Sequence, residues 1–415
     1  MNTRLSEQKE YSPSRKYRWV TTCLIIALAA LSCELPAGII PTSPPAAIPT
    51  STLYVINTLP IETLAVSPTT EPTISPTDTP TVTATVSQPT LVEILPVIPN
   101  LVTQALTPLP PIITETSLSS LAILTSIQAH DNRTASVAFS PDGLYLATGA
   151  YDTEAKVWST SSWTQTYRFQ GHAFSVFQVA VSSDSTRLAT ASNDGTVKIW
   201  NLKTGKLNKT LTGFDSTVHS VAFTPAGDVL VAGAGDGKIH IFNTTTWGRI
   251  RQLAGHHQAV NSVAFSNDGI LLASVSDDGT LRIWQMPDGA MLRTMVVENI
   301  AVHSVDFSPD AKTVVAAYGD TQIRLWDVVS GQLIRTLSGH TKTVPSVSYS
   351  PDGSLIVSGS MDKTVRFWRA ADGVYLAEYK GVDSSVLSVA FSYAQDKLAI
   401  GYFDGSVAVI GLTVH

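Results

Sequence analysis

Short apolar runs separated by turn residues fill the last two thirds of this sequence. In the stretch from Gly255 to Trp284, a Gly-His pair precedes an apolar run that ends at Phe265, and the turn signal Ser-Asn-Asp-Gly separates this run from the next one. A second turn signal at Asp278 and Gly279 precedes a third run, which ends at Trp284. Short apolar runs between turns that contain Asp, Asn and Gly predict three short antiparallel strands.

The same unit recurs at a fixed interval of 42 residues. The slot that ends the first run is aromatic in every copy but one, and its occupants are Phe139, Val181, Phe223, Phe265, Phe307, Tyr349 and Phe391. The slot that ends the third run defines repeats 1 to 7 in chain order and is held by Trp158, Trp200, Phe242, Trp284, Trp326, Trp368 and Ile410. Seven copies without an insertion indicate a repeat architecture in which each unit packs on its neighbours.

A period of this length, with Gly-His near the start and Trp near the end, resembles the WD40 repeat over about residues 121–415. The literal Trp-Asp pair occurs only in repeat 5, at Trp326 and Asp327. The resemblance implies an all-β fold, a seven-bladed β-propeller that forms one domain over residues 121–415. It also implies a non-catalytic module that binds a protein or a peptide.

The apolar pattern inside each repeat predicts how its strands pack. In the third run, Val197 and Ile199 flank Lys198, and Arg282 holds the same cationic position in repeat 4. This period of two predicts one buried and one solvent-facing side. In the first run, the position two before the aromatic slot is Val in every repeat and the opposite face carries small residues, which predicts close packing of the blades near the axis.

The number of runs predicts how the ring closes. Segments between the repeats supply an outer strand for repeats 1 to 6, whereas only five residues follow Ile410. The stretch 121–128 precedes repeat 1. Its Ile127 lies one period of 42 residues before Phe169, which belongs to the outer strand of repeat 1. We therefore expect this N-terminal strand to complete blade 7 and to leave the ring without an open edge.

Residues 1–33 have the pattern of an export signal. A basic stretch is followed by an apolar run from Val20 to Leu31 and then by Ser32 and Cys33. The run is short for a membrane span, which needs about 20 apolar residues, and its context predicts a secretory signal. Its end, from Ala30 to Cys33, resembles the lipobox of bacterial lipoproteins, which implies a lipid on Cys33 and an extracytoplasmic, membrane-anchored protein. An uncleaved N-terminal anchor and ordinary cleavage with release are the alternatives.

Residues 34–120 hold 16 of the 23 prolines and 18 threonines, and no Lys or Arg. Proline at this density prevents helices and removes hydrogen-bond donors from strands. We therefore expect a disordered Pro/Thr-rich linker that holds the propeller away from a membrane. Its Val, Ile and Leu residues leave open whether part of the linker packs on the propeller.

Charge bears on the class of partner, and cysteine content bears on disulfide bonds. The net charge of −6 argues against a nucleic-acid partner, which requires a clustered basic surface. Both cysteines, Cys23 and Cys33, precede the repeats, so the propeller needs no disulfide bonds. We expect a monomer without a cofactor.

Four repeats carry the same set of polar residues. The sets are His130, Thr148, Asp152 and Trp158; His172, Thr190, Asp194 and Trp200; His256, Ser274, Asp278 and Trp284; and His340, Ser358, Asp362 and Trp368. The resemblance to WD40 proteins implies a structural tetrad in which Asp orients His, His contacts the hydroxyl and the hydroxyl contacts the Trp N–H. Repeats 3, 5 and 7 lack both the His and the hydroxyl, as expected if a half-satisfied buried network is costly.

Catalysis by these residues is the alternative interpretation, since Ser, His and Asp also form catalytic triads. Four identical sets, one inside each blade, indicate a structural role instead. The turn aspartates lie one per blade, so they do not supply the several oxygens that one metal ion needs. His219 and His303 share a slot in repeats 3 and 5, where we expect exposed loop residues rather than ligands. An enzyme on a propeller scaffold stays an alternative, although no catalytic motif supports it.

The resemblance places partner contacts at the end of the ring where the Gly-His loops and the turns before the third strands meet. In the consecutive blades 6, 7, 1 and 2 the positions used there are held by Pro345, Met361, Leu387, Phe403, Tyr151 and Phe177. In blades 3 to 5 they are held by His219, Asn261, Asp277 and His303. We predict an apolar crescent beside a polar half, with Arg133 available to an acidic group of a ligand. Tyr151 and Phe177 also leave open a cell-wall or other polysaccharide-binding module.

Overall fold

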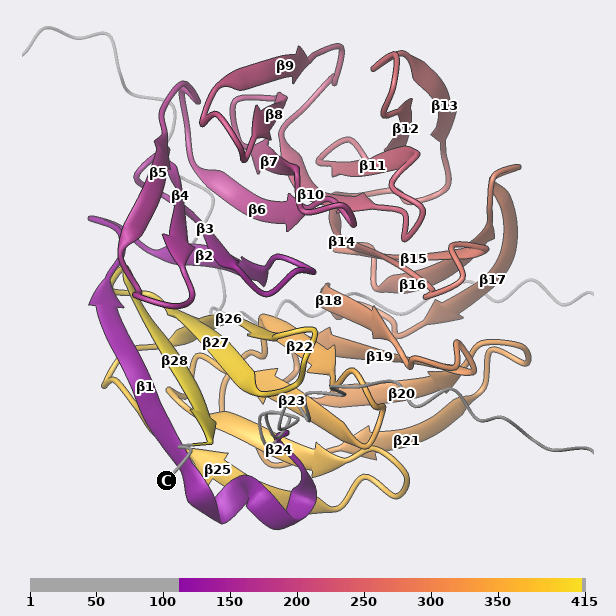
Figure 1. The fold of residues 1–415 in the computed structure, drawn as a ribbon. Helices are drawn as coiled ribbons and strands as arrows, with labels where there is room; N and C mark the ends of the chain where they lie inside the picture. The colour runs from indigo at the N-terminus through magenta and orange to yellow at the C-terminus, as the bar shows by residue number, and fades with distance from the viewer. Residues whose placement is uncertain (1–111, 413–415) are drawn as a thin grey trace, which may run out of the picture. The chain divides into compact units, whose positions relative to one another are not determined.

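The computed structural model describes residues 112–412, which form seven four-stranded antiparallel sheets arranged in a ring (Figure 1). This confirms the all-β, seven-bladed propeller expected from the repeat. The predicted export signal, Cys33 and most of the predicted linker lie outside the described residues. Within residues 112–412, no helix is long and apolar enough to cross a bilayer.

Blades 1 to 3 each run from the strand nearest the axis to the outermost strand in sequence order. Blade 1 consists of β2 (Thr134–Phe139), β3 (Tyr145–Ala150), β4 (Ala155–Ser159) and β5 (Gln165–Phe169). Blade 2 consists of β6 (Val176–Val181), β7 (Arg187–Ser192), β8 (Val197–Asn201) and β9 (Leu207–Leu211). Blade 3 consists of β10 (Val218–Phe223), β11 (Val229–Ala234), β12 (Ile239–Asn243) and β13 (Arg249–Leu253).

Blades 4 to 6 repeat this order. Blade 4 consists of β14 (Val260–Phe265), β15 (Leu271–Ser276), β16 (Thr280–Gln285) and β17 (Ala290–Val296). Blade 5 consists of β18 (Val302–Phe307), β19 (Thr313–Tyr318), β20 (Ile323–Asp327) and β21 (Leu333–Leu337). Blade 6 consists of β22 (Ser346–Tyr349), β23 (Leu355–Gly359), β24 (Val365–Arg369) and β25 (Tyr375–Tyr379).

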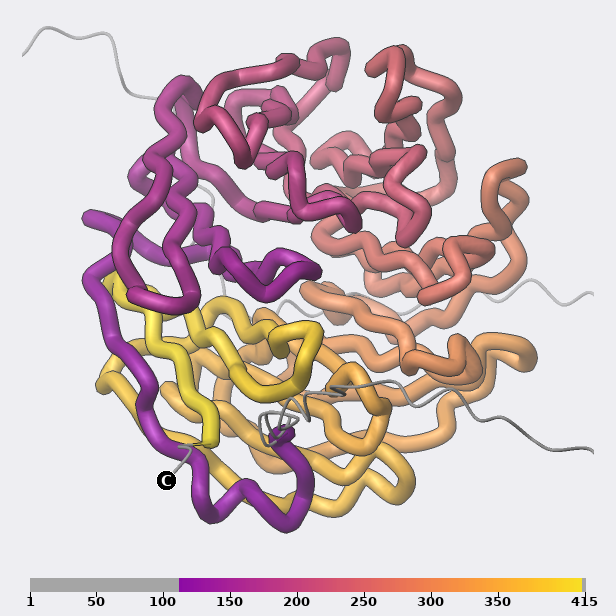
Figure 2. Tube along the Cα trace, viewed as in Figure 1, coloured from indigo at the N-terminus to yellow at the C-terminus, as the bar shows by residue number. Residues whose placement is uncertain are grey.

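Blade 7 joins the two ends of the ring. It consists of β26 (Val386–Phe391), β27 (Lys397–Tyr402), β28 (Ser406–Leu412) and, as its outer strand, β1 (Leu121–Gln128). The antiparallel register between β1 and β28 places Ile123 opposite Ile410 and Ile127 opposite Val407. Figure 2 shows the indigo start of the described chain beside its yellow end. The predicted closure by an N-terminal strand is thus confirmed.

Tight turns between the first and second strands form one end of the ring. In the turn 140–143, the hydroxyl of Ser140 donates to the carboxylate of Asp142 over 2.6 Å, and the amide of Gly143 donates to the carbonyl of Ser140 over 2.9 Å. Gly143 has a φ of 72°, which favours glycine. We call the opening of the central channel at this end the lower mouth, and the opening beside the Gly-His loops the upper mouth.

Small residues let neighbouring blades approach closely near the axis. A Cβ added to Gly149 of blade 1 would lie 2.8 Å from Cγ1 of Val179 and 2.9 Å from Cγ1 of Val176, both in blade 2. Polar side chains also join the blades: the amide of Val179 donates to the hydroxyl of Ser136 over 3.2 Å. The equivalent side chains at four further interfaces are Gln178, Ser304, Ser346 and Ser388. The first strands therefore combine apolar packing with hydrogen bonds that run around the ring.

The cations of the third strands differ from the expectation of a solvent-facing side. Arg282 is buried, and Lys156 keeps only 12% of its side chain exposed. Lys156 Nζ donates to the carbonyl of Ala129 over 2.7 Å. Arg282 Nε donates to the hydroxyl of Thr280 over 3.4 Å. Both charged ends thus reach a polar group while the side chains are largely buried, as long cationic side chains commonly are. The alternation of residues in these strands therefore separates apolar positions from amphipathic ones, rather than buried positions from solvent-exposed ones.

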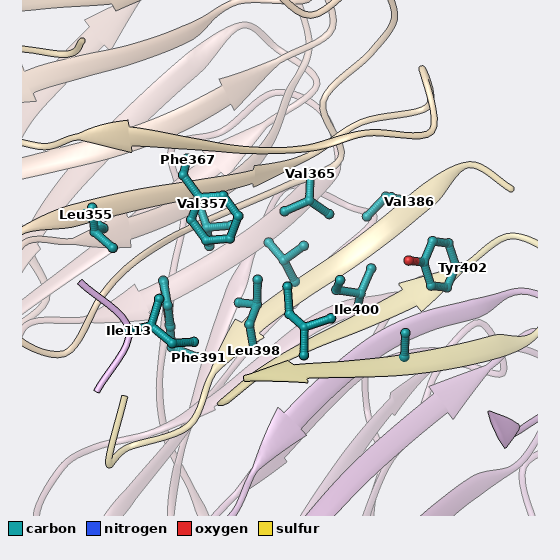
Figure 3. Packing of buried hydrophobic residues seen from close by; sticks show 13 residues of the cluster. Ile113, Leu355, Val357, Val365, Phe367, Val386, Phe391, Leu398, Ile400 and Tyr402 are labelled. Atoms are coloured by element: carbon teal, nitrogen blue, oxygen red, sulfur yellow. The ribbon is translucent and has the colours of Figure 1, made fainter. Parts of the chain in front are cut away.

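The described end of the predicted linker is folded onto blades 6 and 7. Ile113 is fully buried in a cluster with Leu355 and Phe391 (Figure 3). Its amide donates to the carbonyl of Gln395 over 2.7 Å, and the side-chain amide of Gln395 donates back to the carbonyl of Ile113 over 2.7 Å. The 3-10 helix η1 (Glu115–Ser120) follows. The expected boundary at residue 120 therefore lies inside folded structure, because part of the linker packs as its apolar residues allowed.

Candidate functional site

Each of the four predicted tetrads is brought together inside its own blade. In blade 1, His130 Nδ1 lies 2.9 Å from Asp152 Oδ2, and His130 Nε2 lies 2.7 Å from Thr148 Oγ1. The indole N–H of Trp158 donates to the same Thr148 Oγ1 over 3.1 Å. The same chain of contacts joins His172, Thr190, Asp194 and Trp200; His256, Ser274, Asp278 and Trp284; and His340, Ser358, Asp362 and Trp368.

A neutral imidazole satisfies every partner in this chain. A carboxylate only accepts hydrogen bonds, so we assign the ring proton to Nδ1 and let Nε2 accept from the hydroxyl. The hydroxyl oxygen is then free to accept from the indole N–H. Burial lowers the pKa of His172, His256 and His340, although the paired aspartates oppose this shift. These three histidines therefore stay neutral at physiological pH.

The aspartates hold the loops at the upper mouth in place. Asp362 accepts a hydrogen bond from the amide of Thr341 over 3.0 Å, in addition to its contact with His340. Burial alone would raise the pKa of Asp362, but hydrogen bonds from Thr364, Thr341 and His340 lower it to about 2. The tetrad hydroxyls are buried, so they are not presented to a substrate. This geometry is that of a structural network that fixes the Gly-His loop to the Asp turn.

Blades 3 and 5 replace the tetrad with contacts that the repeat comparison missed. In blade 5 the indole N–H of Trp326 donates to the hydroxyl of Tyr318 over 3.1 Å. In blade 3 the ring of Phe214 packs on His240, with 4.6 Å between the ring centroids. Tyr402 holds the position of Tyr318 in blade 7, but its hydroxyl has no hydrogen-bond partner among residues 112–412. In the sequence of blade 5, the Tyr two residues after the hydroxyl slot is the signal that could have predicted the contact with Trp326.

The predicted partner-binding residues gather around a cavity of about 350 Å³ at the upper mouth. Its apolar side is lined by Tyr151, Phe177, Pro345, Met361 and Leu387, all from the predicted crescent. The rings of Tyr151 and Phe177 pack edge to face with their centroids 5.6 Å apart. The cavity thus collects five residues that lie up to 236 positions apart in the sequence.

Arg133 and Phe403 lie at the rim, where blades 1 and 7 meet, and do not line the cavity. The guanidinium carbon of Arg133 lies 4.0 Å from the ring centroid of Phe403 and 5.2 Å from that of Tyr151. Phe403 keeps 43% of its surface exposed. Within residues 112–412, no carboxylate lies within ion-pair distance of Arg133. The guanidinium of Arg133 is therefore positioned by two aromatic rings, and its charge remains available to a ligand.

The polar side of the cavity is organised by hydrogen bonds. His219 Nδ1 lies 3.3 Å from Asn261 Oδ1, and Asn261 Nδ2 donates to the carboxylate of Asp277 over 2.6 Å. The expectation that His219 and His303 are exposed loop residues is wrong, because both lie half-buried on the first strands β10 and β18. Burial lowers the pKa of both rings, against the opposing charge of Asp277. Both ring nitrogens of His219 are already engaged, Nε2 with the hydroxyl of Thr217 at 2.8 Å and Nδ1 with Asn261. The neutral imidazole of His303 makes no hydrogen bond among residues 112–412, so it can offer a donor and an acceptor to a ligand.

Comparison with known proteins identifies the repeat. The family model described as WD domain, G-beta repeat matches residues 121–159, 163–201, 205–243, 247–285, 291–327 and 331–369. Each matched segment ends one residue after a Trp slot. A search of curated proteins found no match. Repeat 7 lies beyond the matched segments, and it has Ile410 in the Trp slot. Since the matches cover more than half of the chain and the ring has seven blades, the chain belongs to the WD40 repeat family, whose propellers are typical protein-interaction scaffolds.

Proposed function

We propose that this protein is a non-catalytic scaffold that binds a protein or peptide at the upper mouth of its propeller. The observation that carries the proposal is the cavity there, in which the apolar side around Tyr151 and Phe177 faces the polar side around His219 and Asn261. A cavity of about 350 Å³ is at the small end of the range for ligand sites. It fits a few side chains of a partner, while the surrounding rim contacts the rest.

Arg133 gives the rim a preference for an acidic group. Its guanidinium lies over Phe403 and Tyr151, so the side chain is already ordered before a ligand arrives. Pre-ordering reduces the entropy lost on binding. We therefore expect the partner to insert apolar side chains between Tyr151 and Leu387 and to place an acidic group beside Arg133. Aromatic and Arg residues of this kind are typical interface anchors.

A pull-down with matched variants tests this proposal. The purified protein is used as bait on an envelope fraction, the recovered protein is identified by mass spectrometry, and its affinity is then measured directly. Changing Phe177 and Phe403 together to Ser should abolish recovery without changing the melting temperature. Phe174→Ser is the control, because Phe174 is 57% exposed in the neighbouring loop and does not line the cavity. Undiminished recovery by the double variant would move the site elsewhere.

Polysaccharide binding is the second class to test. Sugar-binding sites stack rings of the carbohydrate on exposed aromatic faces, whereas the ring of Tyr151 contacts Arg133 and Phe177. The contacts of Tyr151 therefore favour a protein or peptide ligand. Co-sedimentation with insoluble cell-wall polysaccharide distinguishes the two classes, and loss of co-sedimentation in the double variant would assign the site to sugar.

The second part of the proposal is an extracytoplasmic location with a lipid anchor on Cys33. Support comes from the basic start, the apolar run and the lipobox-like end of residues 1–33, followed by the Pro/Thr-rich linker. Cys33→Ala should abolish labelling with palmitate and leave an unprocessed precursor. Cys23→Ala is the matched control and should leave both unchanged. A mature wild-type protein that is soluble and unlabelled contradicts the anchor. The monomeric state and the lack of a nucleic-acid partner belong to the same proposal.

A further inference from the structure

The central channel continues below the upper mouth through two adjoining cavities. The middle cavity shares Ser304 and Gln178 with the upper one, and it shares Asp306 and Tyr393 with the cavity at the lower mouth. The lower cavity has a volume of about 340 Å³. Among the residues that line the middle and lower cavities, Asp306 is the only one with a charged side chain.

Asp306 departs from the pattern of the other six repeats. Its slot, one before the aromatic that ends the first strand, is held elsewhere by Ala138, Ala180, Ala222, Ala264, Ser348 and Ala390. These small residues permit the close approach of the first strands. A carboxylate in this slot therefore places one negative charge on the wall of a channel that is otherwise lined by apolar and neutral polar groups.

Hydrogen bonds between blades account for only one oxygen of this carboxylate. Asp306 Oδ2 accepts from the amide of Tyr349 over 2.9 Å and from the hydroxyl of Ser348 over 3.0 Å. No hydrogen bond to Oδ1 is present among residues 112–412. The same pair of blades is already joined by the bond from the Val347 amide to Ser304. Five interfaces use a neutral Ser or Gln for that purpose, so joining the blades does not require a charge.

A second departure from the repeat lies at the same place. The residue two after the aromatic slot is Pro in four of the repeats, as in Pro309 and Pro351, whereas blade 7 has Tyr393. Tyr393 lines both the middle and lower cavities, and 61% of its surface is exposed. An unpaired carboxylate oxygen and an accessible aromatic ring thus border one cavity that opens to solvent.

We propose that the lower part of the channel binds an alkylammonium group, which pairs with Asp306 Oδ1 while its carbon chain lies along Tyr393. A protonated amine supplies the hydrogen-bond donors that Oδ1 lacks, and charge-assisted bonds of this kind are stronger than neutral ones. Aromatic rings also attract ammonium groups. A divalent metal fits less well, because residues 112–412 contain no group of three His, Cys, Asp or Glu side chains that could hold one. This site is separate from the one proposed at the upper mouth.

Calorimetric titration of the full-length protein with n-butylammonium chloride tests the site. At neutral pH and low salt we expect saturable binding at one site per chain. Asp306→Asn keeps an oxygen for the Tyr349 amide and removes the charge, so it should weaken binding by about tenfold or more. Asp306→Ser, which places the blade 6 residue in the slot, should do the same. Glu298→Gln is the control, since Glu298 is exposed and does not line the channel.

Two further titrations define the ligand. n-Butanol has the same carbon chain without the charge and should not bind. A blocked tripeptide with a central Lys distinguishes the source of the amine: tighter binding than n-butylammonium assigns the site to a partner's side chain, and equal binding assigns it to a free amine. The proposal is overturned if wild type shows no saturable binding of either cation, or if Asp306→Asn binds n-butylammonium as tightly as wild type does.

Discussion

Trp326 donates its indole N–H to the hydroxyl of Tyr318, and blade 5 thereby keeps the contact that Ser or Thr provides in four other blades. Tyr318 is fully buried, and burial raises the pKa of its hydroxyl, which stays protonated. The guanidinium carbon of Arg324 lies 4.5 Å from the centre of the Tyr318 ring, and Arg324 pairs with Asp320 over 2.6 Å. A buried indole N–H therefore finds a partner even where the tetrad is lost.

Removing that partner should destabilise the protein. Tyr318→Phe leaves the Trp326 N–H buried without an acceptor, and the free energy of unfolding should fall by about 1–3 kcal/mol. Tyr402→Phe is the matched control: the Tyr402 hydroxyl is buried without a partner, so its removal should be neutral or slightly stabilising. Urea denaturation of both variants measures the difference. Equal losses in the two variants would show that the Tyr318–Trp326 bond contributes nothing.

The tetrads should show coupling that the aromatic cluster of blade 3 does not. His172→Ala removes a hydrogen-bond partner from both Thr190 and Asp194, at a cost of about 1–3 kcal/mol. Phe214→Ala should cost packing energy without stranding a polar group. A double-mutant cycle between His172 and Thr190 measures the coupling energy directly. A coupling energy of zero would contradict the interpretation of these residues as a hydrogen-bonded network.

The buried histidines should make the protein less stable in acid. The folded-state pKa values of His172, His256 and His340 lie below the unfolded value of about 6.5. Unfolding therefore takes up protons, so the stabilising contribution is present above about pH 6.5 and is lost as the pH falls through the lowered values. Replacing His172 with Gln, which does not titrate, should flatten this dependence. If the melting temperature of the His172→Gln variant depended on pH as steeply as that of wild type, this prediction would be contradicted.

Asp306 should have the opposite effect on stability. Burial raises its pKa to about 6, while the unfolded value is about 3.9. The folded state then holds the proton that the unfolded chain releases, so the stabilising contribution is present below about pH 4 and is lost as the pH rises through 6. Asp306→Asn should raise the free energy of unfolding at neutral pH, by up to about 3 kcal/mol, and leave it unchanged near pH 4. A variant less stable than wild type at neutral pH would disprove this.

Shortening the N-terminus should reveal two separate contributions. A chain that starts at Leu121 keeps β1 but loses the burial of Ile113, which is worth about 1.5–3 kcal/mol, together with its hydrogen bonds to Gln395. A chain that starts at His130 loses β1 as well and leaves β28 with an unpaired edge. The melting temperature should be highest for a chain that starts at Ile112, lower for one that starts at Leu121, and lowest for one that starts at His130. Equal values for the last two would rule out closure by β1 as a stabilising contact.

The repeat made the fold predictable, because a 42-residue period carries the order of strands and the phase of Ile127 reveals the closing strand. The tetrads were predictable for the same reason. Departures from the repeat were harder: Tyr318 acts from a position two residues beyond the slot it replaces. The burial of Arg282 was missed because a charge in an alternating strand suggests solvent, although its stem packs like an apolar chain. Ile113 was hidden among prolines, and only the three-dimensional neighbourhood of blades 6 and 7 shows its role.

Closure by β1 also sets the order of events during synthesis. β1 is made before any blade, yet its partner β28 is made after all the others, with Ile123 pairing to Ile410. A ribosome-bound chain must therefore keep an apolar strand unpaired while six blades form, and the final pairing has a very long sequence separation, which slows folding. Two unfinished rings can exchange their β1 strands and make the same contacts between molecules. Refolding yield should accordingly fall as protein concentration rises, with a domain-swapped dimer as the side product.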